Sequence, residues 1–594
     1  MNETNHYSSK TLKKRKKKSS YLARAKKFGK SGRFGHGSHV SEDTYNYFVR
    51  VVEINKKKFD TEQEREIFVA NTFEQTIGQE VTLATNQFTS YAIEQLIPCA
   101  TDESIEKFML ALASDLRPIC CDIFASHVIQ SLLKFASDRV QELSDCEGEA
   151  SVWLSKHMDW ILKVGRFLLN NIDEFAWETY ANPVMRTVLE VISGGVVTHS
   201  YNSKEKVKKI DPELKPMVPK LFKSLLKDYC KLVTSLPQLS DLTTATLTSG
   251  LLQSLVQAAA RLCHKQLVPL YAKLIEVLKS KESFNDANTR LLEMMLHVAP
   301  ENLYSQLFET FFQGNLKLLS CESRSNFSVQ RLFDSCPSKE QLELLLEEVG
   351  SATVIEEILN AGNTGVILAM GQACERLKSG QGTFIQNLTI ALQCETPEQK
   401  FKLAPLVLAL MNHTKYQAKL KMREEGDPPL VTLQGSLLLQ TLLNFNRPIK
   451  VVQSLLAMEP SELTNIFCDS KGSHVADSFM SSTYVGEKSR EKLCHHLKGR
   501  WTEIACNIWG SRCLDATWRA STLKSRQNIV SELAQHVARL KSDKYGRFIV
   551  QEYGVDLYRH KPGEWIESQG QALRKKKKKS LSSEEPRNKK VKSE

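Results

Sequence analysis

The sequence predicts an all-α protein built as a solenoid of about eleven helical repeats. The chain has 594 residues, far more than one hydrophobic core of ordinary size can hold. A short pattern recurs along most of it: a small or polar residue, an aromatic residue or His, two aliphatic residues and a Gln-like residue. With 18 Pro and 27 Gly the chain is poor in both, which favours long helices over a β-sandwich. Helical units that cannot bury their apolar faces alone must stack on their neighbours, so these observations predict a solenoid.

The repeating pattern is clearest in two units near opposite ends of the chain. Residues 126–130 read Ser-His-Val-Ile-Gln, and residues 547–551 read Arg-Phe-Ile-Val-Gln. We take the first residue of each such unit as its anchor. The anchors are Ser90, Ser126, Asn182, Ser249, Thr289, Asn326, Thr364, Ser436, Ser473, Ser511 and Arg547. Seven of the ten spacings between them lie between 36 and 40 residues, the size of a helical repeat.

Three spacings are longer and require insertions. The segments Asp145–Ala150, Val196–Met217 and Arg423–Pro429 are polar or contain proline, so each is predicted to be a loop. The gap from Thr364 to Ser436 is 72 residues, about two units, and could contain a degenerate repeat.

Within the units, apolar residues follow the spacing of amphipathic helices. Leu342, Leu345, Leu346 and Val349 recur at three and four residues, as do several apolar residues between 533 and 540. Strand-like alternation is rare, so each unit is predicted to be a pair or triplet of helices.

The repeating pattern has the chemistry needed to hold a flat base. On a helix, residues four apart share one face, with Cβ atoms about 5–6 Å apart. Ser126 and Gln130 could therefore both contact the edge of one base bound in a groove of the protein. His127 would point about 100° away and could stack between that base and the next. One unpaired base for each helical repeat is a known mode of RNA recognition.

These units resemble Pumilio (PUF) repeats, in particular at residues 126–130, 326–330 and 545–551. The long array, the basic tails and the run 542–553 are most similar to the nucleolar Pumilio-repeat family called nucleolar protein nine. The resemblance covers about residues 45–565. It implies a curved or U-shaped solenoid of eleven repeats that binds precursor ribosomal RNA during small-subunit assembly. The expected location is the nucleolus and nucleus.

The resemblance also assigns roles to individual residues. By the family code, Ser90 and Glu94 with Tyr91 would read guanine. Ser126 and Gln130, and likewise Ser436 and Gln440, would read adenine. Asn326 and Gln330 with Phe327 would read uracil, and the side chains of Asn326 and Gln330 would both face the RNA. The remaining predicted RNA-binding residues are Ser473, His474, Asp477, Ser511, Arg512, Asp515, Arg547, Phe548 and Gln551.

Several units depart from the family pattern. Residues 364–368 offer neither a stacking side chain nor an edge reader, since Gly365 and Leu368 stand at those positions. Pro183 and Gly250 replace the stacking residue in two further units. Asp477 and Asp515 stand where Gln or Glu is usual. We therefore expect partial sequence preference together with recognition of RNA shape.

Charge divides the chain into a body and two tails. Residues 1–40 carry a net charge of +11 and residues 570–594 carry +7, so the 529 residues between them carry −6 of the total +12. We expect a basic, Gly-containing disordered tail over 1–44, a solenoid over 45–568 and a second basic disordered tail over 569–594. The tails are interpreted as nuclear or nucleolar signals with phosphate affinity. The glycines between Gly29 and Gly37 are interpreted as an RGG-like tail element.

Other functional classes lack their motifs. No GxSxG, HExxH, Walker A or kinase pattern occurs, which indicates that the protein is not an enzyme. The 14 Cys show no zinc spacing, so we expect reduced thiols, no metal and no cofactor. The longest apolar run, 403–411, is too short to span a bilayer. We expect a monomer that binds single-stranded RNA, with proteins of the pre-ribosomal particle as possible further partners.

The main alternative is a HEAT-like scaffold that binds proteins. The negative charge of the body fits it, but a HEAT array needs no aromatic residue or His after the small anchor. The two interpretations differ on whether the residues after the anchors are exposed on one surface or buried between helices. Those residues are Tyr91, His127, Phe327, His474, Arg512 and Phe548.

Overall fold

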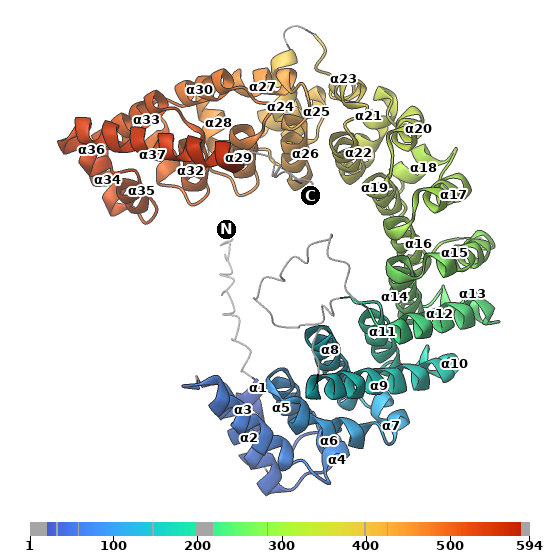
Figure 1. The fold of residues 1–594 in the computed structure, drawn as a ribbon. Coiled ribbons are helices and arrows are strands. Elements are labelled where there is room, and N and C mark those ends of the chain that lie inside the picture. The colour runs from blue at the N-terminus through green and yellow to red at the C-terminus, as the bar shows by residue number, and fades with distance from the viewer. Residues whose placement is uncertain are drawn as a thin grey trace, which may run out of the picture. The chain divides into compact units, whose positions relative to one another are not determined.

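The protein is a stack of helices in two compact units. The computed structural model describes residues 21–583 except 31, 33, 58, 145–147, 196–217, 282, 397–398 and 425. Contacts divide the chain into Met1–Val298 and Ala299–Glu594. In the described part the secondary structure is helical, apart from one isolated bridge between Gly37 and Asn86 (Figure 1). The predicted all-α repeat fold is confirmed.

The first unit contains helices α1 to α16. Their bounds are α1 Tyr21–Lys30, α2 Glu42–Asn55, α3 Glu62–Glu74, α4 Glu80–Ala84, α5 Gln87–Leu96, the 3-10 helix η1 Ile97–Cys99, α6 Asp102–Leu112, α7 Leu116–Cys121, α8 Ala125–Leu143, α9 Glu149–Asn170, α10 Ile172–Phe175, α11 Ala181–Ile192, α12 Lys220–Ser235, α13 Leu239–Leu242, α14 Thr246–Leu262, α15 His264–Lys279 and α16 Asp286–Val298.

The second unit contains helices α17 to α37. Their bounds are α17 Glu301–Phe311, α18 Leu316–Cys321, α19 Asn326–Ser335, α20 Lys339–Val349, α21 Ala352–Ala361, α22 Thr364–Leu377, α23 Gln381–Ala391, the 3-10 helix η2 Lys400–Lys402, α24 Leu403–Ala409, α25 His413–Lys421, α26 Leu433–Leu443, α27 Ile449–Leu456, α28 Pro460–Phe467, α29 Ser473–Ser481, α30 Glu487–His496, α31 Trp501–Ala505, α32 Gly510–Ala520, α33 Leu523–Gln535, α34 Val537–Ser542, α35 Gly546–Glu552, α36 Val555–His560 and α37 Pro562–Ser583.

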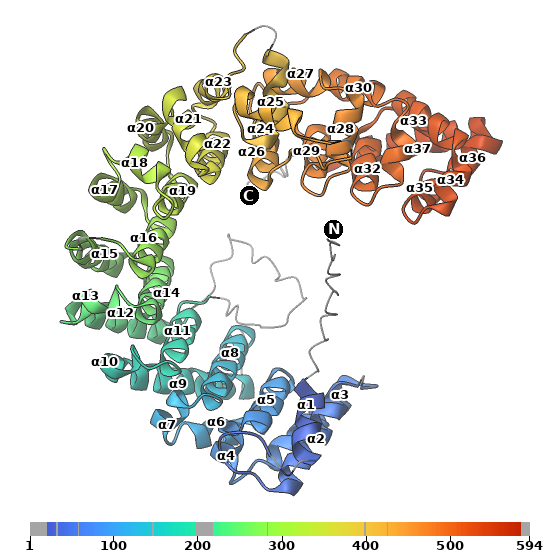
Figure 2. The same ribbon diagram turned by 180° about the vertical axis from the view of Figure 1, so that it is seen from behind.

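Each unit has two rows of helices, and within each unit all the anchors lie in the same row. In the first unit α5, α8, α11, α14 and α16 pack one on the next, backed by a second row that includes α3, α6, α9, α12 and α15. In the second unit α19, α22, α26, α29 and α32 do the same, and α35 carries the last anchor (Figure 2). We call these eleven the reading helices.

A recurring cap explains why the reading helices begin where they do. Four residues before the anchor, a side-chain oxygen accepts hydrogen bonds from the backbone N–H groups two and three residues further on. This cap satisfies donors that the first turn of a helix leaves without partners. It is made by Asn86, Asp122, Glu178, Asn285, Asp469, Asn507 and Asp543, at 2.6–3.3 Å.

The long gap before Ser436 adds no reading helix. Helix α22 packs directly on α26, while α24 packs against α26 and α27. Helix α24 takes the place before α26 that α28, α31 and α34 take before their reading helices, so α25 is the insertion. Among the residues described, the gap contains no further reading helix. The predicted loop Val196–Met217 lies outside the described residues, and the loop at 423–429 falls between α25 and α26.

The glycine-containing segment before α2 packs on the first repeat. Asn86 Nδ2 donates hydrogen bonds to the carbonyl oxygens of Phe34 and Ser38, each at 2.9 Å. At Gly37, where φ is +89°, an added Cβ atom would lie 2.1 Å from the Thr85 carbonyl oxygen. Only glycine fits this close approach, so Gly37 has a structural role in place of the expected RGG-like one.

Helix is also present outside the predicted solenoid boundaries. Helix α1 lies before residue 45, and α37 continues past residue 568. At the start of α37 Trp565 is buried, and its Nε1 donates a hydrogen bond to the Tyr553 carbonyl oxygen at 2.7 Å. In the described part of the chain no helix is long and apolar enough to cross a membrane. The described residues also contain no group of three His, Cys, Asp or Glu side chains placed to hold a metal ion.

Candidate nucleic-acid interface

Five consecutive positions on each reading helix have a fixed pattern of burial. We number them one to five from the anchor. Positions three and four are buried in all eleven helices, as at Val128 and Ile129, because they pack between the two rows. Positions two and five are never fully buried. The two positions that the sequence assigned to stacking and to edge contact are therefore accessible throughout.

Position two presents exposed rings at regular places along the reading helices. Phe327 and Phe548 are 59% and 55% exposed, whereas Phe333, six residues further along α19, is fully buried. His127, His474 and Arg512 are also exposed, and Tyr91 is half-buried. A large apolar ring is normally buried in a core, so its repeated exposure at one position indicates a binding surface. The scaffold alternative predicted that these residues are buried between helices, and in the structure they are exposed or half-buried.

Position one is mostly buried, and its polar atoms already have partners inside the protein. Asn326 is only 3% exposed. Its Nδ2 donates to the carbonyl oxygens of Glu322 and Ser323, and its Oδ1 accepts from Gln330 Nε2 at 2.9 Å. The expectation that Asn326 faces the RNA groove together with Gln330 is thus wrong for the free protein, because this amide holds the start of α19.

The anchor serines show the same arrangement. Ser436 Oγ donates to the Lys471 carbonyl oxygen of the next repeat at 2.7 Å and accepts from Gln440 Nε2 at 3.0 Å. Ser249 repeats this geometry with Ala287 and Gln253. Ser90, Ser126 and Ser473 are likewise buried, whereas Ser511 is half-buried and Arg547 is exposed.

Position five supplies partly exposed polar groups next to the rings. Gln130 accepts a hydrogen bond from Thr187 Oγ1 of the next repeat at 3.2 Å. Asp515 accepts one from the Tyr553 hydroxyl at 2.7 Å. Asp477 lies 3.6 Å from His474 Nδ1 and Gln551 is exposed. These groups are the accessible members of the predicted edge pairs.

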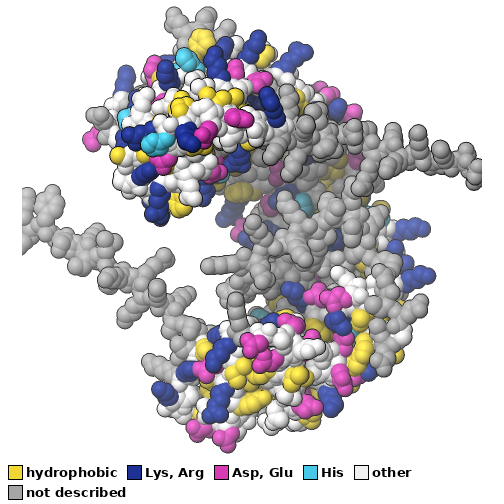
Figure 3. Space-filling model, turned by 60° about the vertical axis from the view of Figure 1, so that its left-hand side comes forward, with side chains coloured by type: hydrophobic (Ala, Val, Ile, Leu, Met, Phe, Trp, Pro, Cys, Tyr) yellow, Lys and Arg dark blue, Asp and Glu magenta, His cyan; other side chains and the backbone are white. Residues whose placement is uncertain are grey.

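Burial raises the pKa of two side chains in the first repeat, Glu94 and Tyr91. It raises the pKa of the Glu94 carboxyl to about 7, so this group changes charge near neutral pH. Burial also raises the pKa of Tyr91, and the charge of Glu94 adds to that shift. Elsewhere Lys/Arg and Asp/Glu side chains are interspersed over the faces drawn in Figure 3. The described surface there is therefore a mixture of both charges, as the net charge of the body predicts.

Comparison with known proteins identifies the family. Residues 78–548 match the NOP9-like PUF repeat domain. The chain belongs to the NOP9-like PUF repeat family. It is 29% identical to the mouse protein named Nucleolar protein 9, over 89% of each chain, and 24% identical to Pumilio homolog 23 of Arabidopsis thaliana, over 89% of this chain and 72% of that one. A structure of APUM23 with GGAUUUGACGG superimposes with a TM-score of 0.70 at 22% identity, covering 89% of this chain and 99% of that one. The resemblance inferred from the sequence is confirmed.

Two PUF repeats have glycine at position two, and in each of them a side chain of the preceding repeat lies close to that glycine. A Cβ atom added to Gly365 would lie 2.6 Å from the side-chain nitrogen and oxygen of Gln330 in the preceding repeat. A Cβ atom added to Gly250 would likewise lie 3.3 Å from the Arg186 guanidinium, whose Nε donates to Ser254 Oγ. The departures seen in the sequence at these glycines therefore coincide with close contacts between repeats.

The PUF repeat of α16 contains two accessible residues that the sequence interpretation did not single out. Thr289 was recognised as its anchor, and the burial pattern places Arg290 at position two and Glu293 at position five. Arg290 is exposed, and a guanidinium plane can stack on a base as a ring does. The signal in the sequence is that Arg290 directly follows the anchor Thr289, as Arg512 follows Ser511.

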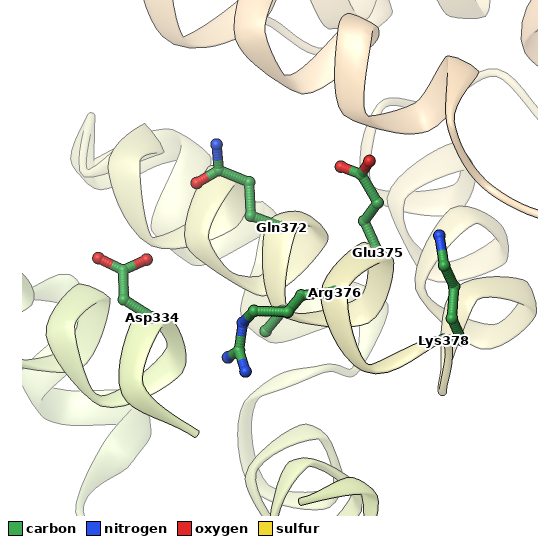
Figure 4. Close-up of a pocket in the computed structure, with 6 residues that line it drawn as sticks. Asp334, Gln372, Glu375, Arg376 and Lys378 are labelled. Atoms are coloured by element: carbon green, nitrogen blue, oxygen red, sulfur yellow. The ribbon is translucent and has the colours of Figure 1, made fainter. Parts of the chain in front are cut away.

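One cavity of the second unit, between α19 and α22, has no excess of either charge. It measures about 540 Å³ and is lined by Asp334, Gln372, Ala373, Glu375, Arg376 and Lys378 (Figure 4). Arg376 donates hydrogen bonds to the carbonyl oxygens of Cys336 and Phe333 at 2.7 and 3.0 Å. This arginine ties α22 to the end of α19, so its role is structural.

Proposed function

We propose that the protein binds single-stranded RNA through positions two and five of its PUF repeats and has no catalytic activity. The observation that carries the proposal is the exposure of Phe327 and Phe548 at the same repeat position, beside buried neighbours. An exposed ring flanked by amide and carboxylate groups can stack on a base and contact its edge. Such groups require unpaired bases, since pairing hides the base edges.

The hydrogen bonds of the free protein indicate how an edge contact would form. Gln440 Nε2 donates to the buried Ser436 Oγ, and Gln330 Nε2 donates to Asn326 Oδ1. We infer that the position-five amide leaves this partner to reach a base, and that position one acts mainly by orienting it. By the family code, Glu94 at position five favours guanine, whereas Gln130 and Gln440 favour adenine and Gln330 favours uracil. Because these three residues are all glutamine, the choice between adenine and uracil then depends on how the residue at position one, Ser or Asn, orients the amide.

We further propose that the RNA is precursor ribosomal RNA, bound in the nucleolus during assembly of the small ribosomal subunit. The names of the mouse and human relatives support a nucleolar location. The net charge of the basic segments at both ends supports attraction to RNA and nuclear import. Crosslinking of the protein to RNA in cells, with sequencing of the bound fragments, tests this. Recovery of messenger RNA without precursor ribosomal RNA would contradict it.

Competition binding tests the mode of recognition. The full-length protein is titrated with single-stranded GGAUUUGACGG, the RNA named with the similar structure, and with the same strand in a duplex. A random-sequence RNA selection run in parallel defines the preferred bases. We expect tighter binding to the single strand and enrichment of a short motif. Equal or tighter binding to the duplex would exclude recognition of unpaired bases and indicate that the protein binds RNA only by electrostatic attraction.

A further inference from the structure

A second cavity of the second unit lies at the start of two reading helices. It measures about 460 Å³ and lies at the beginning of α22 and α26. Its polar lining consists of Asn360, Thr364, Asn412, Lys415, Lys419, Thr432 and Gln434, and its apolar lining of Leu359, Ala409, Leu410 and Met411 with Gly362. Two ammonium groups and several amide and hydroxyl groups therefore surround a space without any carboxylate, unlike the cavity of mixed charge at Arg376.

The two lysines come from the insertion between repeats. Helix α25 begins at the N-cap Asn412, whose side chain accepts a hydrogen bond from the Lys415 backbone N–H at 3.0 Å. Lys415 and Lys419 lie four residues apart, so they share the face of α25 that lines the cavity. Lys415 Nζ donates to Asn360 Oδ1 at 2.6 Å. Within the described residues, no hydrogen bond or ion pair engages the Lys419 ammonium, so its charge is available to a ligand.

The cavity adjoins the repeat that is least able to read a base. Its lining includes Thr364, the anchor of α22, in the repeat that has Gly365 and Leu368 at positions two and five. Asn360 stands four residues before this anchor, at the position of the recurring helix cap, and here it accepts from Lys415. The repeat thus combines the absence of base-reading side chains with a positively charged cavity at its edge.

We propose that this cavity binds a backbone phosphate of the RNA, with Lys419 as the main contact and Lys415 and the neighbouring hydroxyl and amide groups in support. The inference rests on the proposed function. Because α25 places its charge beside Thr364, the RNA is held at this repeat by its phosphodiester without its base being read. A phosphate contact orients a strand and adds affinity without sequence preference. Two lysines suit this task, since an ammonium group binds phosphate as a point charge.

The test compares two lysines of the same helix. Full-length Lys419→Gln and Lys421→Gln each remove one charge from α25, but Lys421 does not line the cavity. Binding to GGAUUUGACGG is measured over a range of salt concentrations. We expect Lys419→Gln to reduce the slope of log affinity against log salt by about 0.7, the value for one phosphate on a single strand. Lys421→Gln should leave the slope nearly unchanged, and both variants should retain the melting temperature and base preference of the wild type.

A scan of the RNA backbone identifies the phosphate itself. Single linkages of GGAUUUGACGG are replaced by neutral methylphosphonates. One replacement should weaken binding of the wild type but have no further effect on Lys419→Gln. Equal salt slopes for the two variants, or the absence of such a linkage, would overturn the proposal. Competition by free adenosine monophosphate, lost in Lys419→Gln, would instead assign the cavity to a mononucleotide. If the wild type binds neither this RNA nor any selected RNA, the proposed function itself fails.

Discussion

The side-chain amide of Gln330 lies against Gly365 of the next repeat, where a Cβ atom would come within 2.6 Å of it. This contact couples position five of one repeat to position two of its neighbour. The glycine leaves room for an amide that also donates to Asn326 Oδ1. In the proposed binding mode, the orientation of Gln330 therefore depends on Gly365, which has no side chain to offer a base.

Gly365→Ala should displace Gln330 without unfolding the protein. Gly365 is helical, and alanine in a helix is favoured over glycine by about 0.5–1 kcal/mol. We expect a retained or raised melting temperature and a loss of base preference at the one RNA position that Gln330→Ala also affects. Gly382→Ala in α23 is the control, since a Cβ atom there would meet nothing within 4 Å. Unchanged preference in Gly365→Ala would mean that the orientation of Gln330 does not matter.

Asn326 and Gln330 should separate into a folding residue and a reading residue. Asn326→Ala removes a buried amide that serves two carbonyl oxygens, so it should cost about 1–3 kcal/mol of unfolding free energy. Gln330→Ala removes a partly exposed side chain but also the donor to the buried Asn326 Oδ1, so it should cost about 1 kcal/mol, less than Asn326→Ala. Urea denaturation measures both. RNA selection should show altered preference for Gln330→Ala; a fall in stability equal to that of Asn326→Ala would argue against its role as a reader.

Two phenylalanines of one helix give a matched comparison. Phe327→Ala should weaken RNA binding by about 1–3 kcal/mol, the contribution of one stacked base, with little loss of stability because the ring is 59% exposed. Phe333→Ala, at a fully buried ring of the same helix, should cost about 3–5 kcal/mol of unfolding free energy. Titration with RNA measures the affinity of both variants, and denaturation measures their unfolding free energy. If Phe327→Ala destabilised the protein as much as Phe333→Ala does, Phe327 would be a core residue and not a stacking residue.

The repeat could be predicted from the sequence because burial imposes it at every turn of the solenoid. Positions three and four must be apolar or small in each reading helix, so Val128 and Ile129 or Ile549 and Val550 appear as a regular pair. The anchors also have a structural role that was not predicted. The small polar side chain makes buried hydrogen bonds, as Ser436 does with Lys471 and Gln440.

The details of the candidate site could not be predicted, because they depend on contacts between repeats. Nothing near Gly365 in the sequence indicates that Gln330 fills the space beside it, since 35 residues separate them. The cavity at Lys419 likewise depends on where the inserted helix α25 lies relative to the starts of α22 and α26. By contrast, the helix caps were visible as Asp, Asn or Glu four residues before most anchors, a regularity that the sequence interpretation did not use.

The N-terminal basic segment and the segment after it should behave differently on deletion. Removing residues 1–20 takes away seven Lys/Arg and should reduce nucleolar accumulation and salt-sensitive RNA binding, with an unchanged melting temperature. Removing residues 1–40 also takes away the backbone that Asn86 binds at Phe34 and Ser38, so the melting temperature should fall. Thermal unfolding of both deletions checks this. Equal stability would show that the contacts at Asn86 contribute little.

The carboxyl of Glu94 should make the first repeat sensitive to pH near neutrality. Burial raises its pKa in the folded protein to about 7, above the ordinary value of 4.5. The folded state therefore binds this proton more tightly than the unfolded state, and the contribution of Glu94 to stability falls as pH rises from 4.5 to about 7. Glu94→Gln should then melt higher than the wild type at pH 8 and no higher at pH 4.5.

The affinity for RNA should rise with pH, opposite to the stability contribution of Glu94, because the ionised carboxylate accepts hydrogen bonds from the N–H groups of guanine. We expect the wild type to bind a guanine-containing site more weakly at pH 6 than at pH 8, with a flat profile for Glu94→Gln. The exposed Glu103 of α6 provides the control, since Glu103→Gln should follow the wild type in both measurements. A wild-type profile that matches that of Glu94→Gln would exclude Glu94 as the reader of this base.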